Sequence, residues 1–415
     1  MYKMNRKNLF NHMENQSFAC FFSGTSPVRT ADQTYPFEVN KNFFYLTGIK
    51  EENVALVMIK GANMEKSFLF IEKTDPVTAL WVGETMSMEE AKAISMVDEV
   101  FERKDFRTVL SKFLQDSRQA VFGALNALYL DLDRRSMDAL ETESDRFGNE
   151  MRNLYPNLVI ASLHPKLGEL RSVKHTHEVK MMQEAIEVTR VGIEALMSNA
   201  KAGIREYQLE AYYHFVLNSN GVTTSFNTIA ASGKNATILH YEKNNAVIQD
   251  NDLILFDLGV RKNEYCSDIS RTFPVSGKFT ERQKAYYELV LETNKKSIEM
   301  LKPGITFQEF NEFGKKILAE GLVKMGKIKD VSEVSKYYYH SLGHFLGLDV
   351  HDVGNYTKPF EKGQVITVEP GLYIADEAIG IRIEDNILLT DNGHVNLSES
   401  IIKEVKDIEN FMSKK

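Results

Sequence analysis

Two apolar runs in the second half of the chain each end on an acidic residue. The segment LILFDLGV (253–260) aligns with VITVEPGL (365–372): four largely apolar residues, an acid, one further residue, a glycine and an apolar residue. An acid at the end of a run that reads as a buried strand needs a partner, because desolvating an isolated carboxylate is costly. We therefore expect cations to meet Asp257 and Glu369.

The surroundings of these two acids repeat as well. In each half a histidine lies 17 or 18 positions before the acid, and a second acid lies 11 or 15 positions after it. The two sets are His240, Asp257 and Asp268, and His351, Glu369 and Glu384. These shared offsets predict an internally duplicated core.

Two kinds of cation could satisfy four such acids. A single buried acid usually pairs with Arg or Lys, but Arg261, Arg271 and Arg382 are too few and too dispersed to neutralise four. Two divalent ions would balance four carboxylates. Oxygen-rich ligation with one imidazole favours Mn²⁺, Co²⁺, Fe²⁺ or Zn²⁺.

The stretch HSLGHFLGLDVHDVG (340–354) adds three histidines. The spacing of His340 and His344 resembles a helical H-E-x-x-H zinc site, yet Ser341 stands where that motif has Glu. Gly343 and Gly347 also disfavour a helix. We interpret the stretch as one wall of a larger site, in which Asp349 and Asp352 orient their neighbours.

A chain of 415 residues predicts two domains. In the first, strands at 53–59 and 66–72, amphipathic helices over 88–116 and a returning strand within 119–133 indicate an α/β domain. Pro165 and Gly168 interrupt the pattern before a long helix begins near Thr176. The boundary is placed there, giving domains 1–170 and 171–415.

The second domain mixes helices and strands. A helix over 205–221 ends on Gly221, a usual left-handed cap. Strand-like segments cover 224–241, 251–260 and 269–275, and two helices follow, split at Pro303 and Gly304. The closing segment, 363–390, is strand-rich again. This order indicates an α+β domain.

Composition excludes some classes of function. The net charge of −8 and the absence of a long Lys/Arg block predict no nucleic-acid partner. No apolar run approaches the roughly 18 residues that span a bilayer, so no membrane association is expected. Two cysteines, Cys20 and Cys266, read as reduced thiols of a cytoplasmic protein.

Five blocks in order resemble a known family. They are ILHY, FDLGVRKNEYCSDISRTFP, HSLGHFLGLDVHDVG, VEPGLY and RIEDNILLT, and they are similar to those of the pita-bread metallopeptidases, which include the Xaa-Pro aminopeptidases (aminopeptidase P) and the prolidases. The segment 23–48 resembles the start of the aminopeptidase P N-terminal domain. The resemblance implies an α+β pita-bread C-terminal domain behind an α/β N-terminal domain. It implies an aminopeptidase that hydrolyses the bond between an N-terminal residue and a following proline.

The resemblance also assigns residues to roles. It implies two divalent metal ions, most often Mn²⁺, and attack of a metal-bound hydroxide on the scissile carbonyl. The implied metal ligands are Asp257, Asp268, His344, Glu369 and Glu384. Glu369 would also shuttle the proton, and His240 and His351 would stabilise the tetrahedral carbonyl. The pocket that receives proline would be lined by His340, Tyr373 and Arg382.

Several alternatives stay open. Prolidase, within the same fold, takes only Xaa-Pro dipeptides, and a non-catalytic binding scaffold would have lost a ligand. The resemblance implies a homo-oligomer, a dimer or a tetramer, because the matching Trp of aminopeptidase P reaches a neighbouring subunit's active site. Trp81 could instead pack in the core. Cys266 is read as a small buried apolar residue, and His164, His175 and His177 as solvated.

Overall fold

The computed structural model describes residues 1–116, 120–134 and 136–414. It separates into two compact units, Met1–Arg171 and Ser172–Lys415. Each unit has its own buried core.

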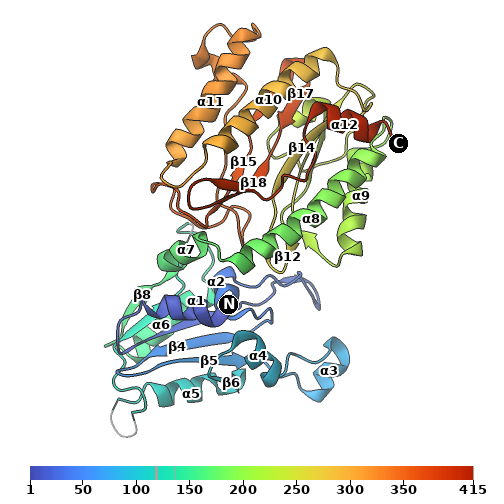
Figure 1. Cartoon of the computed structure of the whole chain (residues 1–415). Helices are drawn as coiled ribbons and strands as arrows, with labels where there is room; N and C mark the ends of the chain where they lie inside the picture. The colour runs from blue at the N-terminus through green and yellow to red at the C-terminus, as the bar shows by residue number, and fades with distance from the viewer. Residues whose placement is uncertain (117–119, 135, 415) are drawn as a thin grey trace. The chain divides into compact units, whose positions relative to one another are not determined.

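The first unit is built on a six-stranded sheet in the order β6-β5-β4-β1-β7-β8. Strand β1 pairs antiparallel with β4 and parallel with β7, and Figure 1 shows α5 and α1 on opposite sides of this sheet. The strands are β1 (Ser17–Phe22), β4 (Ala55–Lys60), β5 (Glu65–Ile71), β6 (Glu99–Glu102), β7 (Ala127–Leu130) and β8 (Val159–Ser162), and a small hairpin joins β2 (Val28–Thr30) to β3 (Gln33–Thr34). The helices are α1 (Tyr2–Phe10), α2 (Lys41–Thr47), α3 (Pro76–Val82), α4 (Met88–Ser95), α5 (Phe106–Phe113), α6 (Glu143–Leu154) and α7 (His164–Ser172).

Aromatic side chains fill one face of that sheet. Phe18, Cys20 and Phe22 alternate along β1 and belong to one buried cluster, as the two-residue period of a strand requires. The Phe22 ring lies 6.2 Å from that of Phe106 on α5 and 5.5 Å from that of Phe147 on α6, centroid to centroid. Apolar burial on this face therefore fixes both helices against the sheet.

Two sequence expectations for this unit were wrong. The segment 88–116 is not wholly helical, because β6 and a 3₁₀ turn (Arg103–Asp105) separate α4 from α5. Pro165 does not break the chain: it is the second residue of α7, where proline is tolerated because the first turn needs no backbone donor. The returning strand expected within 119–133 is confirmed as β7, which pairs with β1, and Gln119 lies outside the described residues.

The second unit surrounds short antiparallel sheets with long helices. Figure 1 shows α8 and α10 running along the outside of β14, β15 and β18. The helices are α8 (Thr176–Asn199), α9 (Glu206–Ser219), α10 (Glu281–Met300), α11 (Phe307–Lys324) and α12 (Val405–Met412). The strands are β9 (Thr223–Thr224), β10 (Ile229–Ser232), β11 (Leu253–Leu258), β12 (Val260–Lys262), β13 (Tyr265–Cys266), β14 (Ile269–Pro274), β15 (Val365–Val368), β16 (Gly371–Ile374), β17 (Ile379–Arg382), β18 (Asp385–Leu389) and β19 (His394–Asn396).

Two three-stranded sheets place the acids in similar positions. One has the order β10-β11-β14 and the other β15-β18-β19. Asp257 lies on β11 opposite Ser270 of β14, while Glu369 directly follows β15, whose Val368 lies opposite Asp385 of β18. In both sheets the second acid directly precedes the partner strand: Asp268 precedes β14, and Glu384 precedes β18. One detail differs from expectation: within the strand-like segment 224–241, residues Gly233–Thr237 form a 3₁₀ helix, η2.

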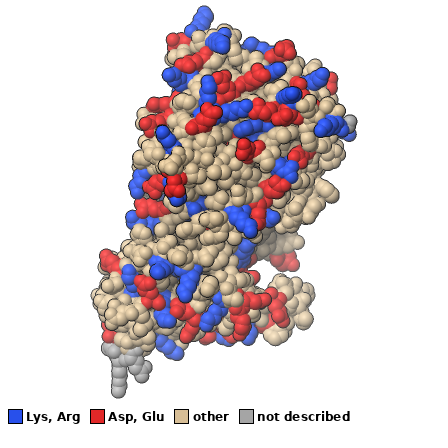
Figure 2. All heavy atoms as spheres, viewed as in Figure 1, with Lys and Arg blue, Asp and Glu red and all other residues tan. Residues whose placement is uncertain are grey.

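The surface carries mixed charge. Figure 2 shows Lys and Arg interspersed with Asp and Glu over the viewed face of each unit. Among the described residues, no helix combines the length and the apolar character needed to cross a bilayer.

Candidate metal centre

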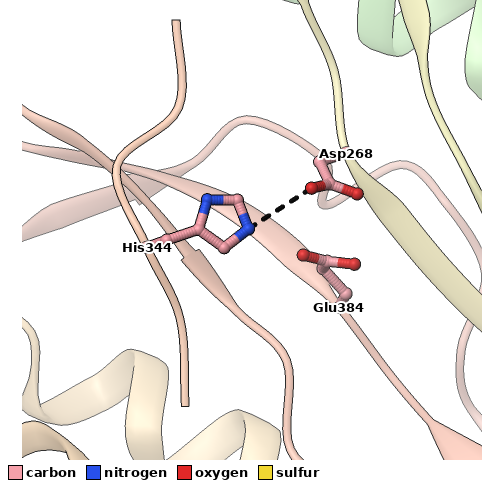
Figure 3. A group of neighbouring side chains, drawn as sticks. All are labelled: Asp268, His344 and Glu384. Carbon is pink, nitrogen blue, oxygen red and sulfur yellow. Dashed lines mark ion pairs between the residues drawn. The ribbon is translucent and has the colours of Figure 1, made fainter. Parts of the chain in front are cut away.

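Three side chains from distant parts of the sequence converge in the second unit. Asp268 precedes β14, His344 lies in the irregular segment 340–354, and Glu384 lies between β17 and β18. All three are buried, and one ligand-type atom of each lies within 4.8 Å of the others. Figure 3 shows the imidazole and the two carboxylates facing one another, with His344 Nε2 3.4 Å from Asp268 Oδ2.

Two further acids border this cluster. Glu369 Oε1 lies 3.8 Å from His344 Nε2. Asp257 Oδ2 accepts a 2.6 Å hydrogen bond from Arg382, whereas its Oδ1 is buried without a hydrogen-bond partner among the described residues. A buried carboxylate oxygen without a donor is the atom that a cation would satisfy.

The backbone of segment 340–354 determines which way His344 points. Its Nδ1 lies 2.9 Å from the Phe345 carbonyl oxygen, to which it donates, so Nε2 faces the acids. The His344 carbonyl oxygen accepts from the Thr367 amide at 2.9 Å. The approach is so close that a Cβ on Gly343 would lie 1.9 Å from the Thr367 carbonyl oxygen. The expectation that 340–354 is not a helix is confirmed.

The cluster holds more negative charge than its burial tolerates. Desolvation raises the pKa of Asp268 to about 6 and that of Glu369 to about 7. Desolvation, with the charges of Asp268 and Glu369, also raises the pKa of Glu384 well above its usual range. Burial alone would lower the pKa of His344, but its hydrogen bond to Asp268 and the charges of Asp268 and Glu369 raise it to about 9. A divalent cation would relieve the same repulsion that protons relieve here, and one imidazole among carboxylates suits such ions.

The residues expected at the proline pocket form a connected network. His340 Nε2 lies 2.8 Å from Tyr373 Oη, and Tyr373 Oη accepts from Arg382 Nη1 at 3.0 Å. Arg382 Nε donates to Ser270 Oγ, and Ser270 Oγ donates to Glu384 Oε2 at 2.9 Å. Arg382 therefore links this network to both Asp257 and Glu384.

Two histidines outside the metal cluster have lowered pKa values, and one of them lies beside His344. The His351 ring lies 4.3 Å from that of His344, centroid to centroid. Burial lowers the pKa of His340 to about 4, and the charges of Arg382 and His240 add to that effect. Burial also lowers the pKa of His351, with further contributions from His344 and His240. The expected carbonyl-binding residue His240 is exposed and precedes the buried Tyr241.

Sequence reasoning missed several supporting residues. Asn386 Nδ2 donates to the Asp268 carbonyl oxygen at 2.6 Å, and its Oδ1 accepts from the Asp268 amide at 3.3 Å. Ser270 and Asn386 each lie two positions after a predicted ligand, so the two-residue period of a strand could have indicated them. Lys174, in contrast, pairs with Asp352 at 3.0 Å, both side chains being 1% exposed, and no local pattern indicated that pair.

Three lesser expectations can be compared with the structure. Core packing of Trp81 is wrong, because this residue is 85% exposed. His164 was expected to be solvated, but its Nδ1 lies 2.7 Å from Asp131 Oδ1 and its side chain is 27% exposed. Cys266 is fully buried, with Sγ 3.6 Å from the Leu348 carbonyl oxygen, as a small apolar residue would be.

Family models match both parts of the chain. Residues 180–391 match the model of metallopeptidase family M24, and residues 2–122 match that of the aminopeptidase P N-terminal domain. The chain belongs to metallopeptidase family M24. The Xaa-Pro aminopeptidase of Haemophilus influenzae is 37% identical over 98% of this chain and 96% of its own, and that of Escherichia coli is 34% identical over 99% and 97%.

Solved structures agree with this assignment. A Bacillus anthracis protein classed as an aminopeptidase P superposes with a TM-score of 0.96 at 46% identity, covering 100% of this chain and 98% of its own. Aminopeptidase P from E. coli, solved with the inhibitor Pro-Leu, gives 0.90 at 33% identity with the same coverage. The predicted fold, an α/β N-terminal domain before a pita-bread domain, is confirmed, and so is the predicted enzyme class, Xaa-Pro aminopeptidase.

Proposed function

We propose that this protein hydrolyses Xaa-Pro-Yaa peptides at the bond before proline, with two divalent ions held by Asp257, Asp268, His344, Glu369 and Glu384. The observation that carries the proposal is the buried convergence of Asp268, His344 and Glu384 from three separate segments. The relatives named as Xaa-Pro aminopeptidases support the choice of reaction.

The bound ions would lower the pKa of a water molecule and polarise the scissile carbonyl. The chain's own contribution to proton transfer would come from Glu369. Its Oε1 lies 3.8 Å from His344 Nε2 at the edge of the cluster, so the carboxyl borders the place where the ions and the attacking water would lie. Its carboxyl would hold the proton of the attacking water and pass it to the proline nitrogen. That nitrogen belongs to a tertiary amide and must be protonated to leave as a secondary amine.

Histidines would serve the other parts of the substrate. His351 and His240 would donate hydrogen bonds to the carbonyl oxygen as it becomes tetrahedral, each stabilising the transition state by about 3 kcal/mol. His340, Tyr373 and Arg382 would border the proline ring. Their mutual hydrogen bonds, 2.8 and 3.0 Å long, support this role because they preorganise the pocket wall.

The choice between aminopeptidase and prolidase rests on one comparison of substrates. The Mn²⁺-loaded protein should be incubated in parallel with an Xaa-Pro-Yaa tripeptide, an Xaa-Pro dipeptide and an Xaa-Ala-Yaa control. We expect cleavage of the Xaa-Pro-Yaa tripeptide. Cleavage of the dipeptide alone would favour prolidase, and cleavage of none would favour the non-catalytic scaffold.

The role of Glu369 has a direct test. Glu369→Gln keeps the size and one oxygen of the side chain but removes the exchangeable carboxyl proton. We expect kcat to fall by about 10² or more. Elemental analysis of the same sample should find metal still bound, and a wild-type kcat in that state would remove Glu369 from proton transfer.

Manganese is the proposed native metal, because the family resemblance favours it and the donor set is rich in oxygen. A zinc-substituted E. coli aminopeptidase P has been solved with product, so several metals should be compared. Metal-free protein reloaded with Mn²⁺, Co²⁺ or Zn²⁺ should bind two ions per chain by elemental analysis. We expect the highest kcat with Mn²⁺.

A homo-oligomer is the proposed assembly. Helix α3 has no buried residue, and it exposes Leu80 by 86% and Trp81 by 85%. Apolar side chains so exposed are typical of an interaction surface, and a second copy of this chain is the proposed occupant. Light scattering should give a dimer or tetramer whose activity falls in Trp81→Ala. A fully active monomer would contradict this assembly.

A cytoplasmic location is proposed on the small number of cysteines. The chain of 415 residues has two, Cys20 and Cys266, and both are buried, as expected of reduced thiols in a reducing compartment. Fractionation of the source cells, followed by detection of the chain in the soluble cytoplasmic fraction, would test this location.

A further inference from the structure

A buried carboxylate outside the candidate metal centre lies at the start of α9. Glu206 is the first residue of that helix and is 0% exposed. Across the described residues, its carboxylate meets five hydrogen-bond donors and forms no ion pair with a cationic side chain. A charge so placed needs several donors to offset its desolvation.

All five donors come from one segment, residues 232–246. Glu206 Oε1 accepts from the Ser232 amide (2.8 Å), from Ser232 Oγ (2.7 Å) and from Asn235 Nδ2 (3.1 Å). Oε2 accepts from Tyr241 Oη (2.8 Å) and from the Ala246 amide (2.9 Å). In return, the Glu206 amide donates to the Ala246 carbonyl oxygen at 3.0 Å. The carboxylate thus joins the two ends and the middle of the segment.

His240 lies in this segment, directly before Tyr241, whose hydroxyl is bound to Glu206. Tyr241, which donates to Glu206, is 8% exposed, whereas His240 is exposed. The other side of the segment packs against strands that border the site. A Cβ on Gly380 of β17 would lie 2.0 Å from the Ala236 carbonyl oxygen, and Tyr339 Oη donates to the Thr237 carbonyl oxygen at 3.2 Å.

We infer that Glu206 is a positioning residue, which holds segment 232–246 through Tyr241 and η2 so that His240 faces the reacting carbonyl. The inference rests on the proposed function, because it takes the role of His240 from there. Glu206 contacts no substrate and acts only through this segment.

The donor pattern explains why the side chain must be a carboxylate. Each oxygen accepts one backbone N–H, Oε1 from Ser232 and Oε2 from Ala246. A backbone amide cannot become an acceptor. In Glu206→Gln, either orientation of the new amide therefore places its NH₂ group against a backbone N–H, leaving buried donors unpaired.

The gentlest test removes one hydroxyl. Tyr241→Phe loses only the group that donates to Glu206 Oε2 at 2.8 Å and lies 3.4 Å from Asn245 Oδ1, and we expect kcat to fall roughly tenfold with KM and metal content unchanged. Tyr286→Phe is the matched control, because Tyr286 Oη also donates to a glutamate, Glu377 Oε1, at 2.8 Å. The control should keep the wild-type kcat.

A double-mutant cycle separates positioning from general stabilisation. If Tyr241 and Glu206 act through His240, adding Tyr241→Phe to His240→Ala should cause no further loss of kcat. Losses that multiply in the double variant would overturn the inference. Equal kcat of Tyr241→Phe and the wild type would overturn it as well.

Hydrogen exchange supplies a readout that does not depend on activity. Glu206→Gln should raise exchange in 232–246 and leave β11 and β14 protected as in the wild type. If Glu206→Gln does not fold, Tyr241→Phe serves for the same measurement. Unchanged protection of 232–246 in the variant would overturn the inference. A different result would refute the proposed function alone: the wild type would be inactive on the peptide, while Glu206→Gln would still increase exchange in 232–246.

Discussion

At the scale of single residues, three histidines within twelve positions have different surroundings. His344 Nε2 faces Asp268 and Glu369, His340 Nε2 meets Tyr373 Oη, and His351 is exposed beside the His344 ring. The irregular backbone of this short segment therefore directs the three imidazoles towards different neighbours.

This separation predicts three different kinetic defects. We expect His344→Ala to lose bound metal, His340→Ala to raise KM, and His351→Ala to keep metal while kcat falls by about 10²–10³. Elemental analysis and steady-state kinetics on an Xaa-Pro-Yaa peptide measure all three. Equal loss of metal in the three variants would show that the roles are not distinct.

The residues that the sequence could and could not reveal differ in a physical way. Asp257 and Glu369 were detectable because an acid that ends an apolar run violates the usual pattern of burial. Asn386 contacts Asp268 across 118 positions, and Glu206 contacts Tyr241 across 35. Their partners are set by tertiary packing, which leaves no trace in local periodicity.

At the scale of elements, the close approach of segment 340–354 to β15 sets a strict size limit at Gly343. A Cβ there would lie 1.9 Å from the Thr367 carbonyl oxygen, a backbone atom that cannot rotate away. We expect Gly343→Ala to lower the free energy of unfolding by about 1–3 kcal/mol or more and to reduce metal content by displacing His344. Chemical unfolding and elemental analysis test this.

A matched control is available for that substitution. A Cβ on Gly393, in the turn between β18 and β19, would meet nothing within 4 Å. Gly393→Ala should therefore unfold at the denaturant concentration of the wild type. Equal stability of the two alanine variants would show that the contact with Thr367 imposes no limit.

Helix α7 carries a second prediction at this scale. The hydrogen bond of His164 to Asp131 raises the pKa of the ring above its usual value. The pair thus stabilises the first unit fully below about pH 6.5, and this stabilisation is lost as pH rises through the raised pKa. We expect His164→Gln to accelerate hydrogen exchange of α7 relative to the wild type at about pH 5.5, and much less at about pH 9. A variant-to-wild-type ratio that is the same at both pH values would contradict the ion pair.

The elements themselves were predictable in proportion to their length. Long amphipathic helices such as α8 and α10 show many turns of one pattern. Strand β6 has only four residues, which is too few to show a clear alternation of apolar and polar side chains. Pro165 was read as a break although the first turn of a helix accepts proline. Short elements and special positions were therefore the ones that the sequence left undetermined.

At the scale of the whole molecule, the length of 415 residues indicated two domains, and the interruption at Pro165 and Gly168 before a long helix placed the boundary near residue 170. The structure has two compact units, Met1–Arg171 and Ser172–Lys415, and one family model matches within each. The pairing of segments within the second unit was not readable from periodicity. It follows from which strands pair and which sheet faces are buried together in the folded chain.

All five candidate ligands lie in one unit, so we expect metal removal to destabilise that unit and not the other. Asp257, Asp268, His344, Glu369 and Glu384 all lie in Ser172–Lys415. Without cations their carboxylates repel one another, and burial raises the pKa of Asp268 to about 6 and of Glu369 to about 7. Metal at 100 times its dissociation constant would stabilise the second unit by about 2.7 kcal/mol. For a unit of this size that is a melting shift of roughly 5–10 °C.

Hydrogen exchange with and without a chelator measures this response along the chain. Chelation should increase exchange in β11, β14, β15 and β18, which carry or flank the acids, and reloading with Mn²⁺ should restore protection. Peptides of β1 and β4, in the first unit, should exchange equally in both states because no candidate ligand lies there. Equal loosening of both units would mean that the metal acts on the whole chain rather than through these five side chains.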